Sequence, residues 1–152
     1  MKKLLFVYLL LNNLLISFPI SAFAIEPIHN ATEGLHYEHA PSEGSIEELY
    51  KDIIVTLLEP VITNEVTIHY GKPLLYDLFD IAFLSIERPS YRSFTFVIRL
   101  KIRPFVGAHN TIGIDEITIR VSLGETKVEE FKHIESFPMP PNLKEDYKDL
   151  KL

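Results

Sequence analysis

The sequence contains no cysteine. This absence excludes disulfide bonds, thiol catalysis, cysteine-ligated zinc sites and a lipid anchor on a cysteine. Many exported domains of this size are held together by disulfides, so a chain without them must be stabilised by its hydrophobic core alone. That is more typical of an exported bacterial protein than of a eukaryotic secreted one.

Basic residues and common catalytic motifs are also scarce. Lys and Arg number 15 against 21 Asp and Glu, which gives a formal net charge of −6 at pH 7. Because an acidic protein is repelled by nucleic acid and by anionic lipid, we expect neither as a partner. The chain has no glycine-rich phosphate loop, no Gly-x-Ser-x-Gly elbow and no His-Glu-x-x-His helix, and no serine stands out as a triad nucleophile. We therefore predict no cofactor and assign no metal ligand from these motifs.

The first 24 residues have the pattern of a secretory signal peptide. Two lysines precede a mostly apolar segment (4–20), and Ala22 and Ala24 form the small-residue pattern of a cleavage site before Ile25. An uncleaved membrane anchor is the alternative, since the apolar segment approaches the roughly 18 residues that span a bilayer. We expect cleavage, no membrane span afterwards, and a protein that is secreted or associated with the cell envelope.

The remaining chain divides into three parts. Residues 25–44 contain prolines and glycines without apolar periodicity, and we expect a flexible lead-in. Residues 45–135 carry the periodic patterns of a single α+β domain. Residues 136–152 begin with a proline-rich stretch and end in charged residues, so an extended, mobile tail is predicted, with docking of Phe137 or Met139 on the core as the alternative.

The folded part begins with a helix. Ser45-Ile46-Glu47-Glu48 forms a capping box, Pro60 kinks or interrupts the helix, and Gly71 ends it. Apolar residues recur at helical spacing in two adjacent rows, namely Leu49, Ile53, Leu57 and Val61 beside Tyr50, Ile54, Leu58 and Ile62. We predict one kinked helix from about 46 to 70, with two shorter helices as the alternative. At its end, His69 and Tyr70 are expected to contact the last carbonyls or the core rather than a ligand.

After Gly71 the apolar period changes from 3.6 to 2, which indicates strands. Strands are predicted at 75–88, with a bulge near Asp80, then at 93–103, from 114 to 122, and at 126–133, the last at an edge. In the second strand the apolar face consists of Phe94, Phe96, Ile98, Leu100 and Ile102. A helix followed by three or four antiparallel strands predicts an α+β fold with a cystatin-like or nuclear-transport-factor-like layout. The helix covers the apolar face of a curved sheet, with Phe94 and Phe96 against Ile53.

Several short motifs are similar to those of a known family. They are Leu57-Leu58-Glu59-Pro60, Tyr70-Gly71, Tyr76-Asp77-Leu78-Phe79-Asp80, Leu84-Ser85-Ile86, the strand from Phe96 to Arg103, Gly107-Ala108-His109-Asn110, Ile117-Thr118-Ile119-Arg120 and Phe131-Lys132-His133. Over roughly residues 46–134 the chain resembles domain of unknown function 3888 (DUF3888), which groups small exported proteins of Bacillus and relatives. The resemblance implies one exported bacterial domain, but it implies no mechanism.

One candidate catalytic group lies in the loop Gly107-Ala108-His109-Asn110. His109 is a usable base, and with Asp77 and Asp80 it could form a carboxylate–imidazole site for a metal ion or for proton transfer. The structural alternative is that Asn110 closes a turn, that His109 bonds to a backbone carbonyl, and that the two aspartates occupy a turn and the solvent-facing surface.

A candidate binding surface lies on the polar face of the predicted sheet. Arg99, Lys101 and Arg103 share that face, and Arg120 joins them from the next strand; with Asn110 they form the predicted binding residues. Such a basic strip suits an anionic cell-envelope polymer or an acidic segment of a protein partner. The alternative is a solvated surface whose charges pair with neighbouring glutamates such as Glu129.

These features favour an exported, non-catalytic binding or interaction module. The alternative function is a small hydrolase or metal-dependent enzyme that uses His109 with Asp77 or Asp80. A protease inhibitor ranks last, because only the cystatin-like layout suggests it and the inhibitory loop motifs are missing.

Overall fold

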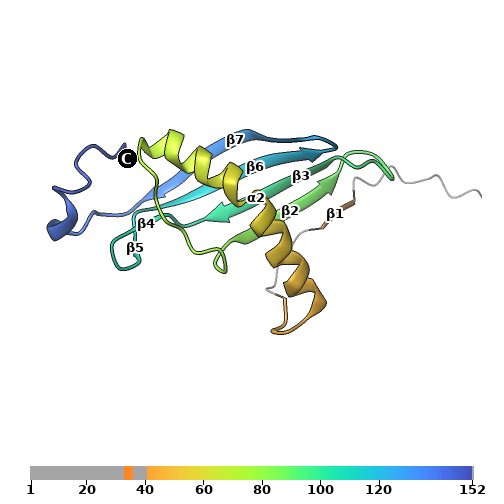
Figure 1. Cartoon of the computed structure of the whole chain (residues 1–152), viewed down its shortest axis with the longest axis horizontal. Coiled ribbons are helices and arrows are strands. Elements are labelled where there is room, and N and C mark those ends of the chain that lie inside the picture. The colour runs from red at the N-terminus through yellow and green to blue at the C-terminus, as the bar shows by residue number, and fades with distance from the viewer. Residues whose placement is uncertain (1–32, 36–40, 152) are drawn as a thin grey trace, which may run out of the picture. The chain divides into compact units, whose positions relative to one another are not determined.

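The computed structural model describes residues 33–35 and 41–151. The predicted signal peptide and most of the predicted lead-in lie outside the described residues. Figure 1 shows one long helix, α2 (Ile46–Tyr70), lying across one face of an antiparallel sheet. The predicted α+β class is confirmed.

The main sheet has five strands in the order β1-β2-β3-β6-β7, and every neighbouring pair is antiparallel. The strands are β1 (Glu33–Leu35), β2 (Ala82–Arg88), β3 (Phe96–Ile102), β6 (Gly113–Ser122) and β7 (Glu125–Ser136). A second, small sheet pairs β4 (Phe105–Val106) with β5 (Asn110–Thr111), and a 3-10 turn, η1, spans Pro141–Leu143. The sequence did not predict β1, which lies in the expected flexible lead-in, or the small hairpin.

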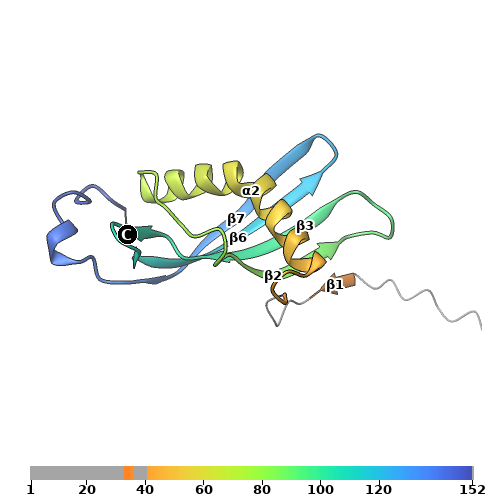
Figure 2. The same ribbon diagram turned by 60° about the horizontal axis from the view of Figure 1, so that its bottom comes forward.

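The predicted helix is present as one element. The Ser45 hydroxyl accepts a hydrogen bond from the Glu48 amide at 3.1 Å, whereas the Glu48 carboxylate accepts from Gly44 rather than from Ser45, so half of the capping box forms. Gly71 ends the helix with a φ of 75°, a left-handed conformation that glycine adopts without strain. Pro60 lies inside the helix, and Figure 2 shows α2 changing direction along its length.

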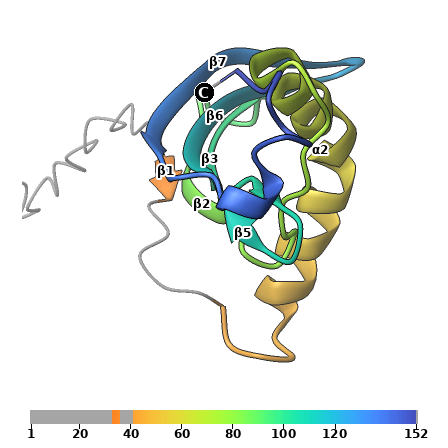
Figure 3. The same ribbon diagram turned by 90° about the vertical axis from the view of Figure 1, so that its left-hand side faces the viewer.

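The core lies between α2 and the sheet, which curves around the helix (Figure 3). The buried residues of α2 follow a spacing of three or four, and they are Val55, Leu58, Ile62, Val66 and Tyr70. The sheet contributes alternate residues of its central strands, namely Ile98, Leu100, Ile102, Ile117 and Ile119. Every second residue of β3 and β6 therefore faces the helix, as the alternation predicted for β3.

The predicted contact of Ile53 with Phe94 is wrong. Ile53 and Leu57 are 48% and 72% exposed, and Phe94 is 69% exposed and precedes β3. Phe96 does pack against the core, to which the helix contributes Leu58 and Ile62 of its second apolar row. Both rows are apolar, and the position of the sheet decides which one is buried.

The first predicted strand is shorter in the structure than in the sequence pattern. Only Ala82–Arg88 forms a strand, while Leu75 makes an isolated bridge to Phe105. The irregularity predicted near Asp80 lies instead between Phe83 and Ser85. The chain between α2 and β2 therefore crosses the end of the sheet without joining it.

The tail after β7 packs against the core, as the alternative allowed for Met139, and is not the mobile segment that was predicted first. Its apolar side chains pack against the core, and they are Met139, Leu143, Tyr147 and Leu150. The Lys151 amide donates a hydrogen bond to the Tyr70 carbonyl at 3.1 Å, which satisfies one of the last helix carbonyls. The tail thus covers the C-terminal end of α2.

Across the described residues, no helix combines the length and hydropathy needed to cross a membrane.

Candidate functional site

Polar side chains from three elements converge beside the C-terminal end of α2. Tyr70 is the last residue of α2, Asp115 lies on the helix-facing side of β6, and His133 lies opposite Asp115 in the β6–β7 register. A register shift between Ile114 and Asp115 then places Ser136 opposite Gly113. Because the shift changes the alternation, His133 and Ser136 face the same side although they are three residues apart.

Asp115 is the centre of this cluster. Its side chain is fully buried; one carboxylate oxygen, Oδ1, lies 2.7 Å from His133 Nδ1, and the other, Oδ2, accepts the Tyr70 hydroxyl at 2.8 Å. A buried carboxylate is costly unless it is hydrogen-bonded, and these two partners meet that requirement. Burial, and then the hydrogen bond to Asp115, raise the pKa of the Tyr70 hydroxyl far above its usual value, so this group remains a donor.

The second ring nitrogen of His133 connects the cluster to solvent. Its Nε2 lies 2.7 Å from the Oγ of Ser136, whose side chain is exposed. The His133 side chain itself is 25% exposed. A continuous series of hydrogen bonds therefore runs from Tyr70 in the core through Asp115 and His133 to a surface hydroxyl.

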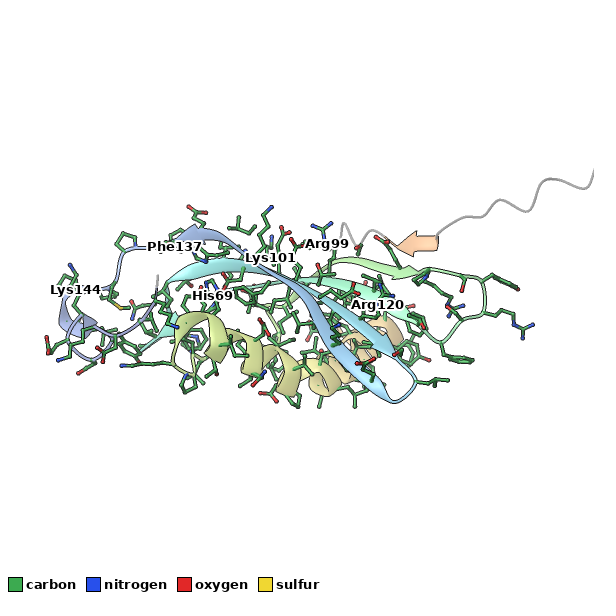
Figure 4. All side chains as sticks on the ribbon, turned by 90° about the horizontal axis from the view of Figure 1, so that it is seen from above. His69, Arg99, Lys101, Arg120, Phe137 and Lys144 are labelled. Carbon is green, nitrogen blue, oxygen red and sulfur yellow. The ribbon has the colours of Figure 1, made fainter. Side chains whose placement is uncertain are left out.

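His69 brings a second imidazole to the same place. Its ring stacks on Phe131 with centroids 4.4 Å apart and on His133 at 5.6 Å. One candidate ligand atom from each of His69, Asp115 and His133 lies within 4.8 Å of the other two. Figure 4 shows His69 near the end of α2, on the side of the sheet that the helix covers.

The structure gives the predicted catalytic residues other partners. His109 stacks on Phe105 at 4.4 Å, both oxygens of Asp80 accept from Arg103 at 2.9 Å, and Asp77 accepts the Phe79 amide at 3.0 Å. Within the described part of the chain, no hydrogen bond or ion pair joins His109 to either aspartate. The proposed His109 site is therefore not assembled by direct contacts.

The predicted basic strip is present, but its arginines are paired. Arg99 contacts Glu116 at 3.0 Å, and Arg120 contacts Glu129 at 2.6 Å, as the structural alternative anticipated. Arg103 is held by Asp80. Figure 4 shows Arg99 and Lys101 on the side of the sheet away from α2.

Asn110 takes the structural role that the alternative gave it. Its amide donates to the Val106 carbonyl at 3.3 Å, across the β4–β5 turn. In that turn Gly107 and His109 have φ values of 55° and 58°. Asn110 therefore stabilises a tight turn rather than extending the basic strip.

Comparison with known proteins identifies the family. The family described as "Protein of unknown function (DUF3888)" matches residues 50–135, more than half of the 152-residue chain. The chain belongs to the DUF3888 family. The matched part of this DUF3888 protein contains Asp115 and His133 and ends one residue before Ser136. Neither the curated proteins nor the solved structures contain a match.

Sequence reasoning missed the cluster, although one signal was present. In Gly113-Ile114-Asp115-Glu116-Ile117, alternation places Asp115 on the same face as the buried Ile117. A carboxylate at an inward-facing strand position requires a buried partner, which points to a polar network. The partners themselves are distant in the chain, because Tyr70 and His133 are 63 residues apart.

Proposed function

We propose that this DUF3888 protein is an exported binding module whose ligand is a divalent transition-metal ion, with zinc the best match. The observation that carries the proposal is the convergence of His69, Asp115 and His133, whose candidate ligand atoms lie within 4.8 Å of one another. Two imidazoles and one carboxylate are a donor set that Zn²⁺ uses in proteins, at about 2.0–2.2 Å from each ligand. Small side-chain rotations bring atoms at this spacing to coordination distance.

Burial and charge support a cation at this position. The Asp115 carboxylate is fully buried, and among residues 33–35 and 41–151 its ion-pair partner is His133, which is charged only when protonated. A metal ion would supply a permanent positive charge in an environment where electrostatic attraction is strong. Because His69 and His133 are both partly exposed, an ion can enter from solvent and keep a water ligand.

The groups around the three candidate ligands also suit a metal site. The Tyr70 hydroxyl holds one oxygen of Asp115, and Ser136 lies 2.7 Å from His133 Nε2. A metal-bound histidine usually donates its other ring N–H to a neighbouring oxygen, which fixes the ring orientation. With Nδ1 of His133 on the metal, the Nε2–H group donates to the Ser136 hydroxyl.

Calorimetric titration of the metal-stripped protein with Zn²⁺ tests this site. We expect one ion per chain at the cluster, and a loss of affinity of more than about 100-fold in His69→Ala and His133→Ala, because each variant lacks a ligand. Tyr70→Phe, which removes a partner of a ligand, is expected to cost about 10–100-fold.

His109→Ala is the matched control, because that imidazole lies in the β4–β5 turn, stacks on Phe105 and is not one of the three candidate ligands. His29, His36 and His39 of the lead-in supply a weak background that is common to every variant. Undiminished zinc affinity in both His69→Ala and His133→Ala would place the ion elsewhere and contradict the proposal.

Export is supported by the N-terminal pattern of lysines, apolar residues and small residues. Expressed in a secreting Gram-positive host, the protein is expected in the medium or the cell-envelope fraction with Ile25 as its first residue, and Ala24→Lys should accumulate as an uncleaved precursor. N-terminal sequencing and intact mass measure both outcomes. A cytosolic protein that retains residues 1–24 would contradict export.

The basic strip offers a second binding surface with less support. An anionic cell-envelope polymer or an acidic protein segment remains a prediction for Arg99, Lys101, Arg103 and Arg120. Since the three arginines already contact Glu116, Asp80 and Glu129, a polyanion would have to displace a carboxylate at each of them.

A further inference from the structure

We infer that Ser136 is an activated nucleophile, and that the metal-free protein transfers acyl groups from carboxylic esters to water through it. His133 is the general base of this arrangement, and Asp115 positions His133. The inference rests on the hydrogen bonds of these three residues and does not depend on the proposed metal site.

The distances meet the requirements for nucleophile activation. Ser136 Oγ lies 2.7 Å from His133 Nε2, and His133 Nδ1 lies 2.7 Å from Asp115 Oδ1. Both values are within the roughly 2.6–3.2 Å over which a base removes a proton from a nucleophile and is itself held by a third group. The order of roles is that of a serine–histidine–aspartate triad, although its residues occur in the chain order Asp, His, Ser.

Asp115, held by Tyr70, favours the tautomer that this role requires. Its hydroxyl donates to Asp115 Oδ2, which leaves Oδ1 to accept the Nδ1–H group of His133. The lone pair of Nε2 then points to the Ser136 hydroxyl and can receive its proton. A buried carboxylate that accepts from Nδ1–H thus favours the form of His133 that acts as a base.

Burial decreases along the series in the direction that catalysis needs. Asp115 is fully buried, the His133 side chain is 25% exposed, and Ser136 is exposed at the end of β7. The Ser136–His133 hydrogen bond is not required to satisfy a buried group, since both side chains reach water. Paired strands hold the His133 and Ser136 backbones in place, which gives the geometry a rigid support.

The reaction follows from these positions. The Ser136 oxygen attacks the ester carbonyl carbon while its proton moves to His133 Nε2, and the resulting tetrahedral centre expels the alkoxide, which takes that proton and leaves as the alcohol. A water molecule then attacks the acyl-serine in the same way. The products are the carboxylic acid and the free Ser136 hydroxyl, so one ester and one water give one acid and one alcohol.

Zinc binding and nucleophile activation require opposite tautomers of His133. When Nδ1 is a metal ligand, Nε2 carries the proton and cannot accept one from Ser136. The nucleophile is therefore available in the metal-free protein, and its experiments are carried out in EDTA.

The test is covalent labelling of the EDTA-treated protein with diisopropyl fluorophosphate, followed by intact and tandem mass spectrometry. The Ser136 oxygen forms a bond to phosphorus, the phosphorus–fluorine bond breaks, and the proton leaves with fluoride. We expect one phosphoryl group, on Ser136, no labelling in Ser136→Ala, and a rate lower by about 100-fold or more in His133→Gln, which loses the general base.

Ser122→Ala is the matched control. Ser122 lies at the other end of the same β6–β7 ladder, and its hydroxyl donates to the Glu125 carbonyl. This variant is expected to react at the wild-type rate. Labelling on another residue, or an equal rate in His133→Gln, overturns the inference.

The zinc site and the Ser136 nucleophile can be contradicted independently of each other. Absence of labelling in a wild-type protein that binds zinc removes the nucleophile alone. Labelling of Ser136 in a protein that does not bind zinc removes the metal site alone.

Discussion

Replacement of Tyr70 by alanine is expected to lower the free energy of unfolding by about 3–5 kcal/mol. Tyr70 is fully buried at the end of α2, where the tail covers it, so the truncated side chain leaves a cavity between helix and sheet. The change also removes the donor to Asp115 Oδ2. Urea unfolding followed by circular dichroism measures the loss.

Tyr70→Phe measures the contribution of the hydroxyl to stability apart from that of the ring. It keeps the packed ring but leaves one oxygen of a buried carboxylate without its partner, which is expected to cost about 1–3 kcal/mol. Tyr76→Phe is the matched control, because the Tyr76 hydroxyl contacts Thr63 at 2.9 Å in a half-buried position. If Tyr70→Phe costs no more than Tyr76→Phe, the hydrogen bond to Asp115 does not hold the cluster together.

The parts of the fold that local chemistry determines were predictable. Ser45 and Gly71 mark the ends of α2 because a capping hydroxyl and a left-handed glycine act on neighbouring backbone groups. The alternation from Phe96 to Ile102 identified β3 and its buried face, because successive strand residues point to opposite sides. Helix followed by antiparallel strands then gave the α+β class.

The parts that depend on distant contacts were not predictable. Leu57 and Leu58 belong to equally apolar helix rows, and only the position of the sheet leaves the first 72% exposed and buries the second. The charged tail packs on the core through four apolar side chains within it. Neither choice is encoded by the spacing of residues within one segment.

The candidate site depends on both local patterns and distant contacts. The alternation within β6 is enough to place the Asp115 carboxylate on the inward face, but its partners come from the helix end and from β7. Ser136 reaches the same face as Asp115 only because the register shifts between Ile114 and Asp115. A shift of one residue reverses the direction of every later side chain, so the sequence pattern of β7 does not indicate where Ser136 points.

Gly113→Ala is expected to disrupt the cluster with the addition of a single methyl group. A Cβ atom at Gly113 would lie 2.6 Å from the Tyr70 hydroxyl oxygen, 3.1 Å from His133 Cε1 and 3.2 Å from the Glu135 carbonyl oxygen. The Tyr70 ring is buried and cannot move aside freely, so the overpacked variant should lose about 1–3 kcal/mol of unfolding free energy. It should also lose zinc affinity and Ser136 labelling, since the displaced tyrosine no longer orients Asp115.

A double-mutant cycle identifies the cause of this loss. The shortest contact at Gly113 involves the Tyr70 hydroxyl, so Tyr70→Phe removes the atom that the new methyl group would strike. Gly113→Ala with Tyr70→Phe is therefore expected to be more stable than the sum of the two single losses implies, by about 0.5–3 kcal/mol, the range found for residues in contact. Gly124→Ala is the control for a change of glycine alone. In the part of the chain that the structure describes, no non-neighbouring atom lies within 4 Å of its Cβ position, and its cost arises from its φ of 80°. That variant should combine additively with Tyr70→Phe, and equal additivity in both pairs would mean that Gly113 is not required for close approach to the cluster.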